Sequence, residues 1–163
     1  MKTLILVRHA KSSWDYPQLS DFDRPLNGRG KRDAPRMGRY LAERDIHADL
    51  IVSSPANRAI TTARTIQEYL VSPMPRIAEE PSLYHASAAT ILRVVQAQPD
   101  DVNSLMIFGH NPGFTDCANQ LSGSYIENIP TCGVVGIEFD VNSWPVVEFG
   151  TGHQLYFHFP KGI

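Results

Sequence analysis

The 163-residue chain has a formal net charge of −2 at pH 7, with 42% hydrophobic and 20% charged residues. This balance is ordinary for a globular protein with a sizeable core, and it excludes the strong basic excess typical of general nucleic-acid binders. No apolar run is long enough for a membrane span or a signal peptide, so we expect a cytoplasmic protein without a membrane partner. The length predicts a single domain over residues 1–163 and leaves the oligomeric state open.

The charges are unevenly distributed along the chain. Residues 1–81 carry thirteen Lys and Arg against ten Asp and Glu, a net +3, whereas residues 82–163 carry two against seven, a net −5. The basic excess lies between Arg24 and Arg44. It fits either a solvated helix face or an attraction for an acidic or phosphorylated partner.

Short apolar runs alternate with helical patterns. In chain order, the sequence predicts a strand at 2–7, a helix ending near residue 44, a strand at 49–52, a helix beginning at Ser54–Pro55, a strand near 76–78, a helix at 86–98, a strand at 104–108, a helix from Pro112 to about residue 121, and strands at 134–139 and 146–149. This alternation predicts an α/β fold, a three-layer sandwich in which a mostly parallel, mixed sheet has helices on both faces. The last two strands are what make the sheet mixed.

Three short motifs lie at strand-to-helix junctions. Arg8 and His9 follow the first strand, Arg58 lies in the first turn of the helix after the second strand, and His110 follows the strand that starts near residue 104. The carboxyl ends of parallel strands meet at one edge of a sheet, where α/β folds bind their ligands. We therefore expect two arginines and two histidines to share one pocket.

Such a pocket suits the transfer of a phosphoryl group. Two guanidinium groups can hold phosphoryl oxygens bidentately, which lysine cannot do. A histidine with one unprotonated ring nitrogen can attack phosphorus while its other nitrogen donates to a fixed acceptor. Each motif alone is commonplace as a turn or a helix start. Their joint appearance at successive junctions favours a chemical role.

The motifs resemble the signatures of the histidine phosphatase superfamily, which has the phosphoglycerate mutase-like fold. Arg8-His-Ala10 is similar to its Arg-His-Gly/Ala signature, residues 54–63 to Ser-Pro-x-x-Arg-Ala-x-x-Thr-Ala, and Gly109-His110 to its Gly-His motif. The resemblance implies that His9 is the phosphorylated nucleophile. It also implies that Arg8, Arg58 and His110 bind the phosphoryl group.

Within the superfamily, the chain resembles the small branch that includes the bacterial phosphohistidine phosphatase SixA. The stretches that carry this resemblance are Arg8-His-Ala-Lys-Ser-Ser-Trp14, Asp23-Arg-Pro-Leu26 and Gly109-His-Asn-Pro-Gly113. The resemblance to this branch implies that the protein is a phosphatase that removes phosphate from phosphohistidine on a protein. Only 51 residues separate Arg58 from His110, which leaves little room for a lid and favours a protein substrate. Hydrolysis of a small phosphate ester is the first alternative, and a non-catalytic phosphate-binding module is the second.

The wider superfamily places an acidic residue between the second and third motifs, where it protonates the leaving oxygen. The corresponding stretch here is residues 79–86, and Glu80 is the candidate acid, although it precedes Pro81 instead of standing in a Leu-x-Glu context. His85 is an alternative donor. A phosphoimidazole protonated on its second nitrogen leaves as neutral imidazole, so the weak signal for an acid favours a P–N bond. Asn111 is expected either to contact the phosphoryl group or to cap the following helix.

We expect neither a cofactor nor a metal. His9 and His110 have no carboxylate or cysteine partners at ligand spacing. The two cysteines, Cys117 and Cys132, also lack metal-type spacing, so free thiols are expected, with a disulfide as the alternative.

Overall fold

The computed structural model describes residues 1–71 and 73–163. Its strands form one six-stranded sheet in the order β3–β2–β4–β1–β5–β6. The strands are β1 (Lys2–Arg8), β2 (Leu50–Ser53), β3 (Ile77–Glu79), β4 (Ser104–Gly109), β5 (Val134–Phe139) and β6 (His153–His158). Strands β1 to β4 run parallel to one another, whereas β5 pairs antiparallel with β1 and β6 antiparallel with β5. The predicted mostly parallel, mixed sheet is confirmed.

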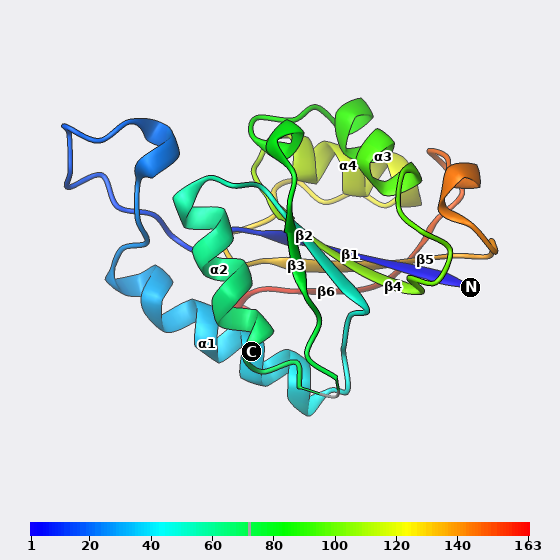
Figure 1. Ribbon diagram of the computed structural model, residues 1–163, viewed down its shortest axis with the longest axis horizontal. Coiled ribbons are helices and arrows are strands. Elements are labelled where there is room, and N and C mark those ends of the chain that lie inside the picture. Colours follow the sequence, from blue (N-terminus) through cyan, green and yellow to red (C-terminus); the bar gives the residue numbers. More distant parts are fainter. Residues whose placement is uncertain (72) are drawn as a thin grey trace.

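Helices cover both faces of this sheet (Figure 1). One face carries α1 (Gly28–Glu43) and α2 (Asn57–Gln67), and the other carries α3 (Ala88–Gln96) and α4 (Gly113–Ser122). The predicted three-layer α/β fold is therefore confirmed. In the described part of the chain, no helix has the length and apolar character needed to cross a membrane.

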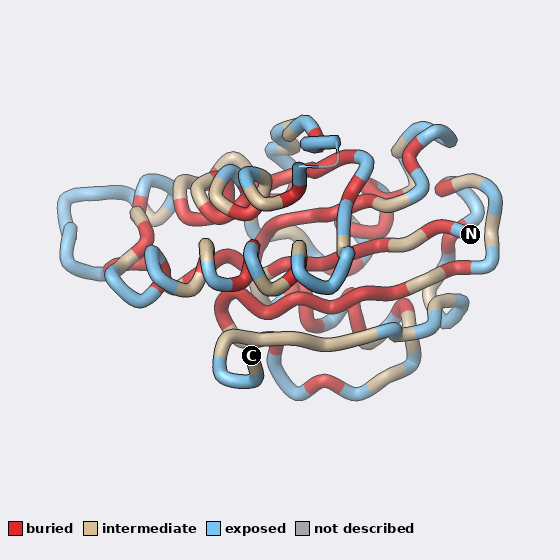
Figure 2. Tube along the Cα trace, turned by 90° about the horizontal axis from the view of Figure 1, so that it is seen from below, coloured by how far each residue is buried: buried red, intermediate tan, exposed pale blue. Residues whose placement is uncertain are grey.

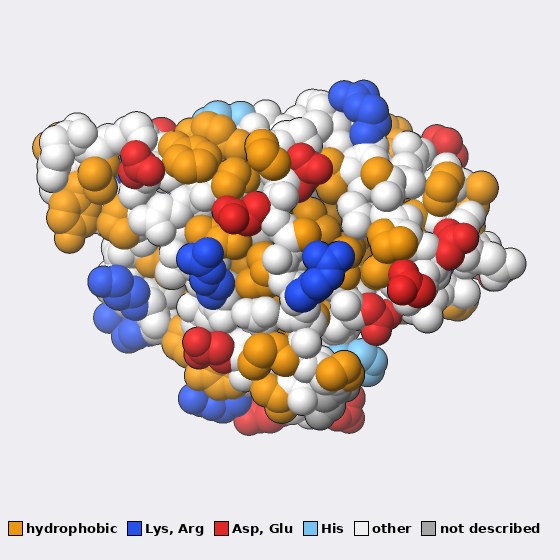
Figure 3. Space-filling view, viewed as in Figure 1, with side chains coloured by type: hydrophobic (Ala, Val, Ile, Leu, Met, Phe, Trp, Pro, Cys, Tyr) orange, Lys and Arg blue, Asp and Glu red, His pale blue; other side chains and the backbone are white. Residues whose placement is uncertain are grey.

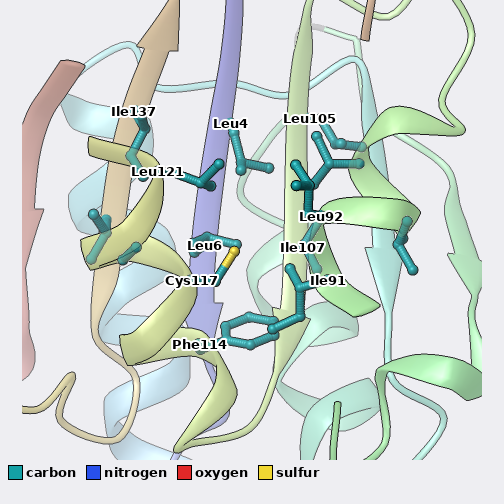
Figure 4. Close-up of a cluster of buried hydrophobic side chains, with 14 of the residues drawn as sticks. Leu4, Leu6, Ile91, Leu92, Leu105, Ile107, Phe114, Cys117, Leu121 and Ile137 are labelled. Atoms are coloured by element: carbon teal, nitrogen blue, oxygen red, sulfur yellow. The ribbon is translucent and has the colours of Figure 1, made fainter. Parts of the chain in front are cut away.

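The central strand β1 supplies both layers of the core, because successive side chains point to opposite faces of a sheet. Leu4 and Leu6 pack toward α3 and α4, where Figure 4 shows Leu4 beside Leu121 and Leu6 beside Cys117. The intervening Ile5 belongs to the second core cluster, on the α1 and α2 side. Figure 2 shows the inner strands as buried and the edge strand β6 as mostly half-buried. The buried sheet thus holds the carboxyl end of β1 at a fixed position.

Two predicted elements are corrected by the structure. The helix predicted to begin at Ser54–Pro55 begins at Asn57, because the Ser54 hydroxyl accepts the Ala56 N–H at 3.3 Å and holds a turn ahead of the helix. The strand predicted at 146–149 was wrong: Trp144–Val146 is a 3₁₀ helix, and the last strand is β6. Trp144 is fully buried and donates to the Val102 carbonyl at 2.8 Å, which fixes this turn.

We expect Gly30→Ala to lower the free energy of unfolding by about 1–3 kcal/mol, because overpacking displaces neighbouring backbone. Gly30 lies in the first turn of α1, where a Cβ atom would come within 2.1 Å of the Lys11 carbonyl oxygen. Gly28→Ala is the matched control, because its Cβ atom would meet the Arg32 side chain at 3.5 Å, an ordinary contact. Urea unfolding followed by circular dichroism measures both variants. Equal stabilities would contradict the tight approach of α1 to residue 11.

Candidate active site

The strand register brings the motif residues of β1 and β4 side by side. Arg8 lies opposite Gly109 in the parallel ladder, so His9 and His110 are the next residues of two adjacent strands. The His9 N–H donates to the Gly109 carbonyl at 3.1 Å, and the two imidazole centroids are 5.3 Å apart. Both rings therefore stand at the carboxyl edge of the parallel strands.

His9 is 7% exposed, and one hydrogen bond fixes its tautomer. Its Nδ1 lies 2.7 Å from the Ala10 carbonyl oxygen. Because a carbonyl can only accept, Nδ1 carries the proton and Nε2 keeps its lone pair. Burial lowers the pKa of His9 to about 4 against the opposing effect of the Ala10 hydrogen bond, and the charges of Arg58 and Arg8 lower it further. The ring is therefore neutral at pH 7.

His110 is 4% exposed, and its ring is held by the hydroxyl of Ser54. The Nε2–Oγ distance is 2.8 Å. Burial lowers the pKa of His110 to about 3, and the charge of Arg58 and any proton on His9 act in the same direction. Its Nδ1 is buried and has no hydrogen-bond partner among the described residues. The ring is thus neutral, and its Nδ1 is free to form a hydrogen bond with a ligand.

Two arginines accompany the histidines with incompletely bonded guanidinium groups. Arg8 Nη1 donates to the Ile129 carbonyl at 2.9 Å. Arg58 Nη1 and Nη2 donate to the backbone oxygen and Oδ2 of Asp21, at 2.6 and 2.9 Å. Within residues 1–71 and 73–163, the buried Nε atoms of both arginines have no partner. Burial also lowers the pKa of Arg8, but a guanidinium remains charged at pH 7.

A cavity of about 310 Å³ lies over these side chains. It is lined by Arg8, His9, Lys11, Ser12, Trp14, Arg24, Arg58, His85, His110, Asn111 and Thr131. Four of these residues are Lys or Arg, and none is Asp or Glu. His9 and His110 form the buried part, whereas Trp14 and His85 are exposed and mark the mouth. The positive lining matches an anionic ligand.

Arg24 lines this cavity, although it belongs to the basic segment for which a solvated helix face was one interpretation. It is 8% exposed, and its Nη1 donates to Ser12 Oγ at 2.7 Å and to the Ser13 carbonyl at 3.2 Å. The Trp14 ring lies 3.6 Å from the guanidinium carbon. The solvated-face interpretation is therefore wrong for this residue.

One carboxylate, that of Asp21, connects the elements around the cavity. Its oxygens accept hydrogen bonds from Arg24 Nε at 3.1 Å, Arg58 Nη2 at 2.9 Å and the Tyr84 hydroxyl at 2.6 Å. His85 Nε2 lies 3.6 Å from Oδ2. Burial by itself would raise the pKa of Asp21, but the hydrogen bonds from Tyr84 and Arg58 hold it well below its usual range. Asp21 is therefore ionised at neutral pH and orients Arg58.

Asn111 lines the cavity, but both ends of its amide have protein partners. Its Nδ2 donates to Asn128 Oδ1 at 3.0 Å and to the Ile129 carbonyl at 2.9 Å. Its Oδ1 accepts from the N–H and the hydroxyl of Thr115, at 3.2 and 2.8 Å. These contacts favour the helix-capping alternative, because they hold the first turn of α4 against the loop that follows the helix.

Glu80 is not among the residues that line the cavity. Its carboxylate accepts from the N–H and hydroxyl of Ser82, at 3.2 and 3.1 Å, and caps the 3₁₀ helix Pro81–Leu83. The candidate general acid of the sequence thus has a local structural partner. His85, the alternative donor, is the residue of this stretch that lines the cavity.

Two further residues of the site were missed by sequence reasoning. Thr62 Oγ1 accepts from the Ala10 N–H at 3.0 Å and donates to the Arg58 carbonyl at 2.7 Å, so it joins the loop after His9 to α2. Its place in the Ser-Pro-x-x-Arg-Ala-x-x-Thr-Ala stretch was a usable signal. Asp21 carried no such signal, because it lies in a polar loop whose path only the tertiary structure reveals.

We expect the ring protons of His9 and His110 to report neutral imidazoles through the range in which an ordinary histidine titrates. Because burial depresses both pKa values, the rings stay unprotonated as the pH falls through 6.5 and take up protons only near pH 4 and pH 3. Histidine-selective NMR, with His9→Ala and His110→Ala for assignment, measures the two curves. A midpoint near 6.5 for either ring would contradict its burial.

An α/β sheet with a cationic cavity at the carboxyl ends of its parallel strands is typical of proteins that bind anionic ligands. The model of the histidine phosphatase superfamily (branch 1) matches residues 4–83. An uncharacterised chloroplastic protein of Arabidopsis thaliana is 34% identical over 151 residues, which cover 88% of this chain and 69% of that protein. The chain belongs to the histidine phosphatase superfamily.

Solved structures share the whole fold. A protein of Agrobacterium tumefaciens that bears the provisional name phosphohistidine phosphatase SixA has a TM-score of 0.84 and 28% identity over 98% of both chains. The protein histidine phosphatase SixA complexed with tungstate has a TM-score of 0.82 and 20% identity, over 98% of this chain and 97% of that one. The fold and the family inferred from the sequence resemblance are thus confirmed.

Proposed function

We propose that this protein is a metal-independent phosphatase that acts through a phosphorylated His9 and removes phosphate from phosphohistidine on a protein. The proposal assigns roles to four residues, Arg8, His9, Arg58 and His110, and treats residues 1–163 as one catalytic domain. It also places the reaction in the cytoplasm, a reducing compartment that suits the two buried, unpaired cysteines.

The single observation that carries the proposal is the set of unsatisfied atoms around the cavity. Among the described residues, four buried side-chain polar atoms have no hydrogen-bond partner, and three of them are Arg8 Nε, Arg58 Nε and His110 Nδ1. Buried polar groups without partners are costly and uncommon in folded proteins. Three at one cationic cavity support a ligand with several acceptor oxygens, such as a phosphoryl group.

The proposed reaction begins with attack of His9 Nε2 on phosphorus, while the P–N bond to the substrate breaks and its imidazole leaves as the neutral ring. The Ala10 carbonyl keeps the proton on Nδ1, so the lone pair needs no base to free it. Arg8 and Arg58 neutralise the phosphoryl oxygens. Because the Ser54 hydroxyl already accepts the Ala56 N–H, its own proton is available to His110 Nε2, which leaves His110 Nδ1 as a donor to the same oxygens. Water then hydrolyses phospho-His9 and regenerates the neutral ring.

Two features of the cavity support phosphohistidine as the substrate. Among the described residues that line it, none is Asp or Glu, which suits a leaving imidazole better than an alkoxide. The loop between β1 and α1 projects from the body (Figure 1), and its Trp14 lines the cavity. Exposed hydrophobic side chains gather on this loop (Figure 3). These side chains are Trp14, Tyr16, Leu19 and Phe22. Apolar side chains beside a cationic site fit a protein surface better than a small metabolite.

The test compares phosphate release from a phosphohistidine peptide and from p-nitrophenyl phosphate, with and without EDTA. We expect release from the peptide that requires His9 and persists in EDTA. Release from the ester alone would select the small-ester phosphatase instead. Binding of phosphate without turnover of either substrate would select the non-catalytic module, and loss of activity in EDTA would overturn metal independence.

A further inference from the structure

We propose that Lys11 selects protein substrates in which an acidic side chain lies beside the phosphohistidine. The inference rests on the proposed function and deepens it, because it states which phosphohistidine sites the enzyme prefers. Lys11 lines the active-site cavity. Its positive charge is balanced neither by the protein nor by a phosphoryl group, and an unbalanced charge favours a further anion on the ligand.

The three guanidinium groups of the cavity lining, by contrast, have enough negative charge to balance them. They belong to Arg8, Arg24 and Arg58. The Asp21 carboxylate accepts from Arg24 Nε at 3.1 Å and from Arg58 Nη2 at 2.9 Å. A bound phosphoryl group carries about two negative charges at neutral pH. One carboxylate and one phosphoryl group therefore cancel the three arginine charges, and the two buried, neutral histidine rings add none.

Lys11 differs from these arginines because its ammonium group has no counter-charge. Among the described residues, this group forms neither a salt bridge nor a hydrogen bond. The residue is half-buried, so part of its side chain remains accessible to a ligand. An ammonium group has three donors on a flexible stem, which lets it follow an anion whose position differs between substrates. Lys11 is therefore suited to a carboxylate that the substrate supplies.

The backbone of Lys11 is fixed close to the nucleophile. The Asn27 N–H donates to the Lys11 carbonyl at 2.9 Å. The first turn of α1 packs directly on the same carbonyl, because a Cβ atom at Gly30 would lie 2.1 Å from its oxygen. Lys11 also follows His9 by only two residues. The ammonium group can therefore contact only those parts of a substrate that lie near its phosphoryl group.

The required anion must come from the substrate, since no Asp or Glu is among the described residues that line the cavity. In an unmodified protein, aspartate and glutamate are the side chains that are negatively charged at neutral pH. The side chains that flank the phosphohistidine are the ones brought near Lys11 when the phosphoryl group is bound. An acidic neighbour of the phosphohistidine is therefore the partner that the charge of Lys11 favours.

The test compares kcat/KM for three peptides in which both neighbours of the phosphohistidine are glutamate, glutamine or lysine. We expect wild-type protein to favour glutamate over glutamine by about fivefold, the size of effect expected for an accessible ion pair, and to disfavour lysine by a similar factor. The preference should disappear in 1 M NaCl, where the Debye length is about 3 Å.

Lys11→Met removes the charge and should make the three peptides equal, whereas Lys11→Glu should reverse their order. Lys31→Met is the matched control, because Lys31 is exposed on α1 and does not line the cavity. It should keep the wild-type order. Thermal unfolding checks that the variants are folded, and the comparison of peptides and salt concentrations in wild-type protein needs no variant.

Equal kcat/KM for the three peptides in wild-type protein, or a preference that survives in Lys11→Met, would overturn the inference. It would also be overturned if Lys11→Met lowered kcat/KM for the three peptides and for p-nitrophenyl phosphate by one common factor, because Lys11 would then bind the phosphoryl group itself. Failure of the proposed function gives a different result, since none of the peptides would then release phosphate in a reaction that requires His9.

Discussion

We expect His9→Ala to lower kcat/KM for every substrate by a factor on the order of 10⁶, the size of effect seen when an enzyme loses its nucleophile. The variant removes the cavity-lining ring whose Nε2 lone pair is left free because Nδ1 donates to the Ala10 carbonyl. Phosphate release from a phosphohistidine peptide at several enzyme concentrations measures the loss.

His47→Ala is the matched control, because His47 is exposed and lies outside the residues that line the cavity. Thermal unfolding should give similar midpoints for the two variants and the wild type. Turnover of folded His9→Ala within about tenfold of wild type would mean that water attacks the substrate directly, and covalent catalysis by His9 would be wrong.

The second large effect is expected for Arg58→Lys, which keeps the charge but loses the planar fork. We expect kcat/KM to fall by about 10²–10³, as when a preorganised donor to the reacting group is lost. Arg58 is 3% exposed and makes two contacts with Asp21 that a single ammonium cannot reproduce. The phosphohistidine peptide and p-nitrophenyl phosphate should be affected alike, because the phosphoryl group is common to both.

Arg64→Lys provides the comparison on the same helix, where Arg64 is exposed and α2 is otherwise unchanged. It should retain wild-type kinetics. A small loss in Arg58→Lys equal to that in Arg64→Lys would show that Arg58 serves only to anchor Asp21, and its proposed role in binding the phosphoryl group would be wrong.

The sequence predicted those parts of the site that depend on strand ends. Arg8, His9 and His110 directly end or follow buried apolar strands, and parallel register alone brings such positions together. The alternation of strands and helices likewise sufficed for the layered fold. For these residues and for the layers of the fold, the local sequence pattern agrees with the tertiary structure, so the sequence alone predicts them correctly.

The parts that failed depend on loops and on side chains shared between distant segments. From the sequence alone, Arg24 cannot be distinguished from the surface arginines. In the structure the loop after β1 folds back, and Trp14 covers the Arg24 guanidinium group. The start of α2 was misplaced because the Ser54 hydroxyl serves His110 and Ala56 instead of capping a helix that begins at Pro55. Hydrogen bonds of this kind do not change the local helix propensity, so the sequence pattern does not predict them.

The central claim is a covalent phosphoenzyme at His9, and trapping it is the most direct test. Wild-type protein turning over p-nitrophenyl phosphate would be quenched in alkali, which preserves P–N bonds, digested and analysed by mass spectrometry. The account predicts phosphate on the peptide that contains His9 and none on that peptide in His9→Ala. Phosphate on His110, or no phosphoenzyme during rapid turnover, would contradict it.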